Sequence, residues 1–343
     1  MIFKQLLRAQ SVQKIQFSVS FIRYIASFAL GLGLAGQVAA AELELRAATI
    51  GSQQGIQMAG LNALAAHVAE ATNNSADIKL FHSGSLGDQV SNIEAIDTRL
   101  LDIATIETPI TTIDEDMGIL SLPYLFRDRE HVSNVLSGEI GQELKDKLQK
   151  QGYRVIGFYE GGFRHITNNS HAIEKPEDLD GLRIRTPGSR QRVEMFNAYG
   201  ANASPLPYPE LYSALQTGVF DGQENPLVEV EASRFYEVQD YLSLSGHVYT
   251  VGFLLMNESR FQDLDASVQQ ALLEGGEQAF EATVNFGEQA DQSVVELVKE
   301  NGMEVNEVDT DAFIAASQPL WDSFTEGLSQ EARDMVQRIA DLP

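Results

Sequence analysis

Two short segments carry side chains suited to holding an anion. In Gly181–Pro187, Arg185 stands at the end of a short apolar strand, directly before a Pro-Gly break. In Asp221–Pro226, Asn225 closes a segment that we interpret as a polar turn. An Arg guanidinium forms two parallel hydrogen bonds to a carboxylate, and an Asn amide adds both a donor and an acceptor. Neither segment holds a nucleophile or an acid–base pair, so we predict capture of an anion without its transformation.

Two further charged residues stand where a cleft between lobes is expected. Arg164 follows Gly161 and Gly162, which we interpret as a crossover between lobes because glycine relieves steric limits where a chain turns. Glu107 ends a short strand ahead of a proline, and a carboxylate there can accept hydrogen bonds from ligand hydroxyls.

Each of these four candidates also has a simpler explanation. Arg185 can be an exposed arginine after an edge strand, as its neighbour Arg183 can. Asn225 can cap a turn before a proline, a common position for asparagine. Arg164 can pair at the surface with one of many acids, and Glu107 can be solvated.

The sequence lacks the common patterns of catalytic and metal sites. It has no cysteine, which excludes disulfides, thiol catalysis and thiolate metal ligands. It has no Gly-x-Ser-x-Gly elbow, no phosphate-binding Gly-rich loop and no His-Glu-x-x-His helix. Its six histidines show no metal-ligand spacing. We therefore expect a binding protein with no cofactor and no metal, and not an enzyme.

Residues 1–40 have the layout of a secretory signal peptide. They contain four basic residues and no acid, an apolar run over Tyr24–Ala35, and small residues before Ala41. That order of basic region, apolar region and Ala-rich cleavage site predicts export to the periplasm. A membrane anchor is the alternative, but the apolar run is short for a bilayer of about 30 Å.

The charge of the chain excludes several kinds of partner. The sequence has 24 basic and 49 acidic residues, for a net charge of −25. Without the four basic residues of 1–40, 20 basic residues face 49 acidic ones and the net charge is −29. Nucleic acid and anionic lipid both require positive charge. An anionic small molecule must therefore be bound by a local basic pocket.

Hydrophobic periodicity predicts an α/β fold. The chain from residue 42 alternates strand and helix patterns, a rhythm typical of a largely parallel sheet covered by helices. The predicted strands are 42–47, 77–81, 102–106, 152–159, 182–185 and 248–256, and the predicted helices are 56–68, 90–101, 191–199, 210–217 and most of the chain from 265 onward.

The order of these elements indicates two α/β lobes. We predict a first lobe from residues 42–161 plus 251–290 and a second from residues 162–250 plus 291–343. Ligands of such folds bind between lobes, at the carboxyl ends of strands. Arg185 stands at such an end.

Four segments together resemble one protein family. They occur in the family's order and are Leu122–Glu130, Gly181–Pro187, Glu210–Gln216 and Asp221–Pro226. In them the chain resembles the extracytoplasmic solute-binding subunits of TRAP transporters. The resemblance implies a periplasmic-binding-protein-like clamshell, with hinge strands crossing between lobes and a long helix spanning both. It also implies a partner, a membrane permease driven by an ion gradient.

The resemblance assigns roles to the four candidates. Arg185 matches the family's carboxylate-pairing arginine, Asn225 its amide partner and Arg164 its second basic residue. Glu107 matches a position that contacts the polar, distal part of the ligand. The loop at His82 differs from many relatives, which carry a proline there, so the far wall of the pocket is expected to differ.

The expected ligand is an organic acid. Two basic residues suit a dicarboxylate, whereas Glu107 favours hydroxyls and repels a second carboxylate. We therefore favour a sugar acid such as a uronate or an aldonate, with C4-dicarboxylates and 2-oxo acids as alternatives. We expect a monomer that delivers the ligand to a TRAP permease; a periplasmic sensor for a receptor kinase is the alternative function.

Overall fold

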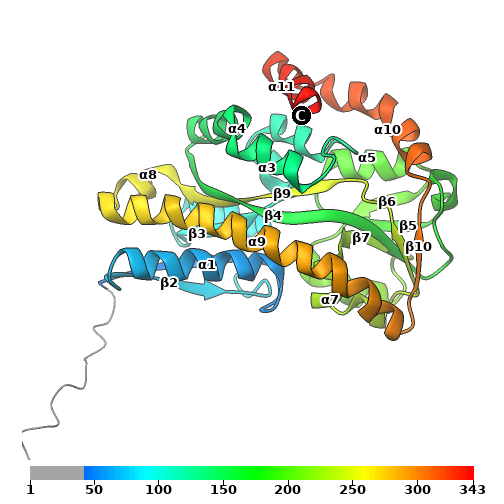
Figure 1. Cartoon of the computed structure of the whole chain (residues 1–343), viewed down its shortest axis with the longest axis horizontal. Helices are drawn as coiled ribbons and strands as arrows, with labels where there is room; N and C mark the ends of the chain where they lie inside the picture. Colours follow the sequence, from blue (N-terminus) through cyan, green and yellow to red (C-terminus); the bar gives the residue numbers. More distant parts are fainter. Residues whose placement is uncertain (1–41) are drawn as a thin grey trace, which may run out of the picture. The chain divides into compact units, whose positions relative to one another are not determined.

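The computed structural model describes residues 42–343 (Figure 1). The predicted signal peptide lies outside the described residues. In the described part of the chain, no helix combines the length and the apolar character needed to cross a membrane.

One mixed sheet runs through residues 42–343, with strands in the order β2-β1-β3-β9-β4-β7-β5-β6; β8 also pairs with β4, and β10 pairs with β8. Every pairing that involves neither β4 nor β9 is parallel, whereas β4 and β9 pair antiparallel with their neighbours. The strands are β1 (Leu43–Ala48), β2 (Ala76–Phe81), β3 (Ile103–Ile106), β4 (Tyr153–Asn168), β5 (Arg183–Thr186), β6 (Asn202–Pro205), β7 (Gly222–Pro226), β8 (Tyr241–Leu244), β9 (Tyr249–Asn257) and β10 (Glu304–Glu307).

Strand β4 joins the two groups of strands. Its first part pairs with β9, and its last part pairs with β7 and β8. The sequence predicts that this strand ends before Gly161, but β4 continues through Gly161 and Gly162 to Asn168. The glycines instead mark an irregularity, because the register shifts between Glu160 and Gly162. Gly162 has a φ of 99° there, which only glycine adopts without strain.

Helices cover the sheet on both sides (Figure 1). The α-helices are α1 (Ile56–Ala71), α2 (Gln89–Asp97), α3 (Arg129–Ser137), α4 (Glu139–Lys150), α5 (Arg190–Ala198), α6 (Leu211–Gln216), α7 (Leu227–Ala232), α8 (Glu258–Gln262), α9 (Ala266–Glu300), α10 (Thr310–Thr325) and α11 (Gln330–Asp341). Short 3₁₀ helices are η1 (Thr108–Thr112), η2 (Glu115–Ser121), η3 (Pro176–Leu179), η4 (Tyr208–Glu210) and η5 (Phe235–Glu237).

The long helix α9 packs against α1 and α7 and crosses β4 between them (Figure 1). Two glycines bring the helix and strand backbones into contact at the crossing. A Cβ at Gly157 would lie 2.6 Å from the Cα of Gly276, and a Cβ at Gly276 would lie 2.4 Å from the carbonyl oxygen of Ile156. Since a Cβ cannot approach backbone that closely, this crossing requires both glycines.

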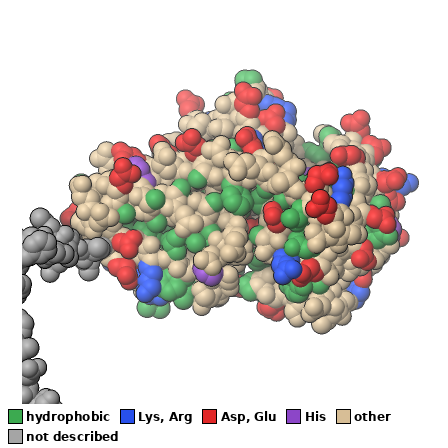
Figure 2. All heavy atoms as spheres, turned by 60° about the horizontal axis from the view of Figure 1, so that its bottom comes forward, with side chains coloured by type: hydrophobic (Ala, Val, Ile, Leu, Met, Phe, Trp, Pro, Cys, Tyr) green, Lys and Arg blue, Asp and Glu red, His purple; other side chains and the backbone are tan. Residues whose placement is uncertain are grey.

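Apolar side chains of the alternating strands and amphipathic helices form the core. Leu45 of β1, Leu61 of α1 and Leu254 of β9 belong to one buried cluster, and Val230 of α7 and Val294 of α9 to another. Acidic side chains are spread over the face drawn in Figure 2, with few basic ones among them. This face therefore carries negative charge, and apolar packing holds the elements together.

Candidate ligand-binding site

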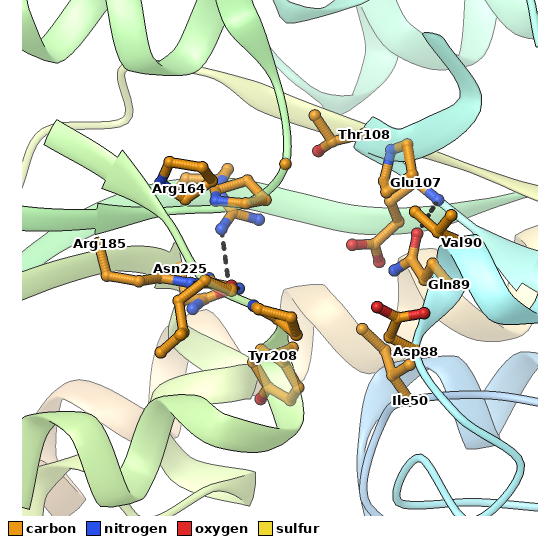
Figure 3. Close-up of a pocket in the computed structure, with 16 residues that line it drawn as sticks. Ile50, Asp88, Gln89, Val90, Glu107, Thr108, Arg164, Arg185, Tyr208 and Asn225 are labelled. Atoms are coloured by element: carbon orange, nitrogen blue, oxygen red, sulfur yellow. Dashed lines mark hydrogen bonds between the residues drawn. The ribbon is translucent and has the colours of Figure 1, made fainter. Parts of the chain in front are cut away.

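All four residues singled out by the sequence line one cavity of about 250 Å³ (Figure 3). Arg164, Arg185, Asn225 and Tyr208 lie on one side, and Glu107 and Asp88 lie across from them. The lining residues are Ile50, Asp88, Gln89, Val90, Glu107, Thr108, Pro109, Arg164, Arg185, Pro187, Gly188, Pro205, Leu206, Pro207, Tyr208 and Asn225.

Arg185 is 2% exposed and lies on β5, which pairs in parallel with β6 and β7. Its Nε and Nη2 both donate to the carbonyl oxygen of Leu206, at 2.8 and 2.6 Å. Within residues 42–343 its Nη1 has no partner, and no carboxylate lies within ion-pair distance of it. Burial lowers the pKa of Arg185 to about 10, so the guanidinium stays charged at neutral pH. Arg183, two residues earlier, is exposed and pairs with Asp221.

A buried carboxylate, Glu224, organises the basic side of the cavity. It is fully buried and accepts hydrogen bonds from Arg164, from Arg192 Nη1 at 3.1 Å and from His247 Nε2 at 3.1 Å. Burial alone would raise the pKa of Glu224, but Arg164 and Arg192 hold it well below its usual range. The cluster therefore contains two permanent cations around one carboxylate and keeps a positive charge.

Arg164 is held by this cluster rather than projecting freely toward a ligand. Its Nη2 donates to the carbonyl oxygen of Glu224 at 2.6 Å and to Asn225 Oδ1 at 2.9 Å. Asn225 Nδ2 donates in turn to Gln223 Oε1. Because these contacts fix the orientation of the Asn225 amide, one N–H of its Nδ2 is left to donate toward the cavity.

Glu107 is fixed by contacts from three segments. Its Oε1 accepts hydrogen bonds from Gln57 Nε2 at 2.7 Å and from the Tyr159 hydroxyl at 3.0 Å, and its backbone N–H donates to Gln89 Oε1 at 2.8 Å. Glu107 Oε2 accepts no hydrogen bond from any described residue. This oxygen is left to accept from a bound molecule.

The Glu224 cluster was not predicted from the sequence, because we interpreted Asp221–Pro226 as a turn. That interpretation is wrong: residues 222–226 form the buried strand β7, which pairs with β4 and β5. The polar run Gln223-Glu224-Asn225 gives no apolar alternation, so its burial is stabilised by hydrogen bonds and ion pairs instead. Periodicity does not connect Glu224 to Arg192 and His247, because these partners lie far from it along the chain.

His82 and Gly84 do not line the cavity, whereas Asp88 at the end of their loop does. His82 contacts Ser83, and Gly84 has a φ of 64° with its Cβ position 2.9 Å from Pro209. The loop ends at Asp88, which caps α2 by accepting from the backbone N–H of Ser91 and lines the cavity. Among residues 42–343, no three His, Asp or Glu side chains converge in a group able to hold a metal ion.

Comparison with known proteins identifies the family. Residues 47–327 match the model of bacterial extracellular solute-binding protein family 7. The 2,3-diketo-L-gulonate-binding periplasmic protein of Escherichia coli K12 is 31% identical over 80% of this chain and 80% of its own length.

Solved structures agree with this match. A TRAP periplasmic solute-binding protein from Chromohalobacter salexigens with bound D-glucuronate is 31% identical, with a TM-score of 0.82 over 87% of this chain and 99% of its own. One from Sulfurospirillum deleyianum with bound succinate is 28% identical, with a TM-score of 0.83 over 88% and 100%. These likenesses confirm the two-lobed α/β fold predicted from the sequence. The chain therefore belongs to bacterial extracellular solute-binding protein family 7, whose members are the periplasmic solute-binding proteins of TRAP transporters.

Proposed function

We propose that this chain is exported to the periplasm, binds a sugar acid such as a uronate or an aldonate as a monomer, and delivers it to a TRAP permease. The ligand carboxylate binds Arg185 through Nη1 and the remaining N–H of Nη2, with one N–H from Asn225 Nδ2. The ligand hydroxyls donate to Glu107 Oε2.

The observation that carries this proposal is the polarity of the cavity (Figure 3). One side presents an unpaired guanidinium group in Arg185, and the opposite side presents carboxylates in Glu107 and Asp88. A molecule with a carboxylate at one end and hydroxyls at the other matches both sides. A dicarboxylate satisfies the first side and is repelled by the second, since like charges at close range in a protein interior are unfavourable.

Lobe closure couples binding to transport. On the lobe boundaries predicted from the sequence, Arg185 and Asn225 belong to the second lobe and Glu107 to the first. A ligand held by Arg185 reaches Glu107 only when the lobes are closed, so its hydroxyls add affinity to the closed form and shift the population toward it. Closure also excludes water and strengthens the carboxylate–guanidinium pair.

A thermal-shift screen of refolded residues 42–343 tests this function. Unfolding the protein and then refolding it removes any ligand that stayed bound through purification. A ligand at about a hundred times its Kd adds roughly 2.7 kcal/mol to the free energy of unfolding. We expect a shift with uronates or aldonates and a smaller one with C4-dicarboxylates and 2-oxo acids at the same concentration. No shift with any of these acids would refute the proposal.

A further inference from the structure

A small inner chamber of about 20 Å³ adjoins the ligand cavity. The two spaces share Ile50, Glu107, Arg164, Tyr208 and Asn225, and the chamber is also lined by Gln57, Gly161, Pro226 and Glu229. About 10–15 Å³ is enough for one water molecule. The chamber therefore holds one water-sized group, such as a single hydroxyl, but not a carboxylate with its two oxygens.

Glu229 is a buried carboxyl group with one unused oxygen. It stands in the first turn of α7 and is 6% exposed. Its Oε2 accepts a hydrogen bond from the Tyr208 hydroxyl, which also lies 2.6 Å from Ser233 Oγ. Its Oε1 is buried and has no hydrogen-bond partner among the described residues. Burying an unpaired polar atom costs free energy. A hydrogen-bond donor bound in the chamber that Glu229 lines would therefore stabilise the protein.

A second unpaired oxygen lies near the first, across the start of α1. Ser52 Oγ is also buried without a partner among residues 42–343. A Cβ placed on Gly55 would lie 3.3 Å from Ser52 Oγ and 3.5 Å from Glu229 Oε1. Glu229 is therefore held by Tyr208 on one side of the chamber and faces the start of α1, whose Gln57 contacts Glu107, on the other.

The groups around Glu229 make its charge sensitive to pH. Burial raises the pKa of Glu229 to about 7, Glu107 adds to this effect, and the Tyr208 hydrogen bond and Arg164 oppose it. Two tyrosines also lie near it: Tyr208, and Tyr159, which hydrogen-bonds to Glu107. Both stay neutral because burial raises their pKa well above the usual value. Near neutral pH the charge of Glu229 in the chamber therefore changes.

We propose that Glu229 is a specificity-determining residue for the end of the ligand opposite its carboxylate. With Glu107, it makes the inner chamber accept one ligand hydroxyl, or a water bound by that hydroxyl, and reject a second carboxylate. This inference rests on the proposed function, because it assumes that the ligand is an organic acid held by Arg185. It adds a residue that neither the motifs nor the four sequence candidates contain.

The test uses two ligands that differ only at the distal end. Galactonate carries a hydroxymethyl group where galactarate carries a second carboxylate. Their Kd values are measured calorimetrically on refolded residues 42–343. The two pH values, about 6 and about 8.5, lie on either side of the Glu229 pKa of about 7. The variants are Glu229→Gln, which keeps an oxygen for the Tyr208 hydrogen bond, and Glu231→Gln, a matched loss of charge at an exposed site on the same helix.

At the higher pH we expect the unchanged protein to bind galactonate about tenfold or more tightly than galactarate. The second carboxylate of galactarate would lie near the charged Glu229, and such a contact costs at least about 1.4 kcal/mol, or tenfold in Kd. The preference should narrow at the lower pH, where Glu229 is protonated. In Glu229→Gln the preference should be smaller than in the unchanged protein at the higher pH, because only Glu107 in the chamber still repels the second carboxylate, and it should be the same at both pH values. Glu231→Gln should behave as the unchanged protein does.

Three results would overturn the inference. The first is a galactonate preference that is the same in Glu229→Gln as in the unchanged protein at both pH values. If galactonate still binds in that case, the proposed function stands and only the role of Glu229 is refuted. The second is an equal effect of Glu231→Gln, which would assign the preference to general surface charge. The third is a Kd that follows sodium concentration instead of the distal group, which would assign the chamber to a cation. Failure of both acids to bind the unchanged protein would refute the proposed function together with this inference.

Discussion

Replacing Arg185 with alanine removes the group on which the proposed binding mode depends. Arg185 donates hydrogen bonds from Nε and from one N–H of Nη2 to the carbonyl oxygen of Leu206. The two N–H groups of Nη1 and the second one of Nη2 remain, so an end-on pair of hydrogen bonds to a carboxylate is available. Arg183→Ala is the matched control, since Arg183 lies on the same strand but is exposed and bonded to Asp221.

The size of the effect follows from these donors. Each hydrogen bond between charged groups contributes about 1.5–3 kcal/mol, and two of them give about 3–6 kcal/mol. Truncating one partner of a buried charge pair costs about 2–5 kcal/mol in comparable interfaces. The overlap of these ranges is about 3–5 kcal/mol, so Arg185→Ala should weaken the Kd about a hundredfold to a few thousandfold, at about 1.4 kcal/mol per tenfold. Arg183→Ala should leave the Kd within about twofold, because a surface ion pair contributes little.

Titration calorimetry of the refolded proteins with the best ligand of the thermal-shift screen measures this difference. The free Arg185→Ala protein should unfold at a somewhat lower temperature, because it loses the two hydrogen bonds from Arg185 to the Leu206 carbonyl. It should still fold, because no ion pair within residues 42–343 is broken. An Arg185→Ala protein that folds and binds within about threefold of the unchanged Kd, well under one 1.4 kcal/mol step, would refute the assignment of the carboxylate to Arg185.

Three further predictions concern stability. Glu224→Gln should lower the free energy of unfolding by about 3–5 kcal/mol in urea titrations, because it leaves Arg164 and Arg192 buried without their anion. Since the folded-state pKa of Glu224 is depressed, its contribution is present above about pH 4.5 and is lost as pH falls; the urea midpoint of the unchanged protein should therefore fall more steeply below that pH than that of Glu224→Gln. Glu229 acts in the opposite sense, because its folded-state pKa is raised to about 7. Between about pH 4.5 and pH 7 the unchanged protein should lose about 3 kcal/mol of unfolding free energy relative to Glu229→Gln. Parallel curves of unfolding free energy against pH would contradict this. Gly276→Ala should lower the unfolding free energy by about 1–3 kcal/mol through overpacking; an unchanged melting temperature would show that α9 and β4 separate without cost.

The parts of the fold that periodicity predicts are those with a regular apolar pattern. The strand patterns near β1, β2 and β3, and the long helical run at α9, agree with the structure because each buries one face. The continuation of β4 through Gly161 and Gly162 was not predicted. Glycine normally interrupts strand patterns, and here pairing with β7, β8 and β9 overrides that preference.

In the candidate site, too, the sequence predicts the residues at the ends of regular strands and misses those held by distant partners. Arg185 and Glu107 were predictable because each ends a short strand whose carboxyl end opens on the cleft. Glu224 was not, because its strand β7 is polar and is stabilised by partners far apart in the sequence, Arg164, Arg192 and His247. Glu229 was hidden for a similar reason: in the sequence it is one acid of a short acidic helix, and only the packing of α7 against the rest of the protein separates it from exposed Glu231.

A crystal structure of residues 42–343 with a bound uronate or aldonate tests the central claim most directly. We predict that the ligand carboxylate lies about 2.7–3.0 Å from Arg185 Nη1 and Nη2, with a ligand hydroxyl within hydrogen-bond distance of Glu107 Oε2. A carboxylate bound at the opposite end of the cavity, or held by Arg164 with Arg185 still bonded only to Leu206, would contradict it.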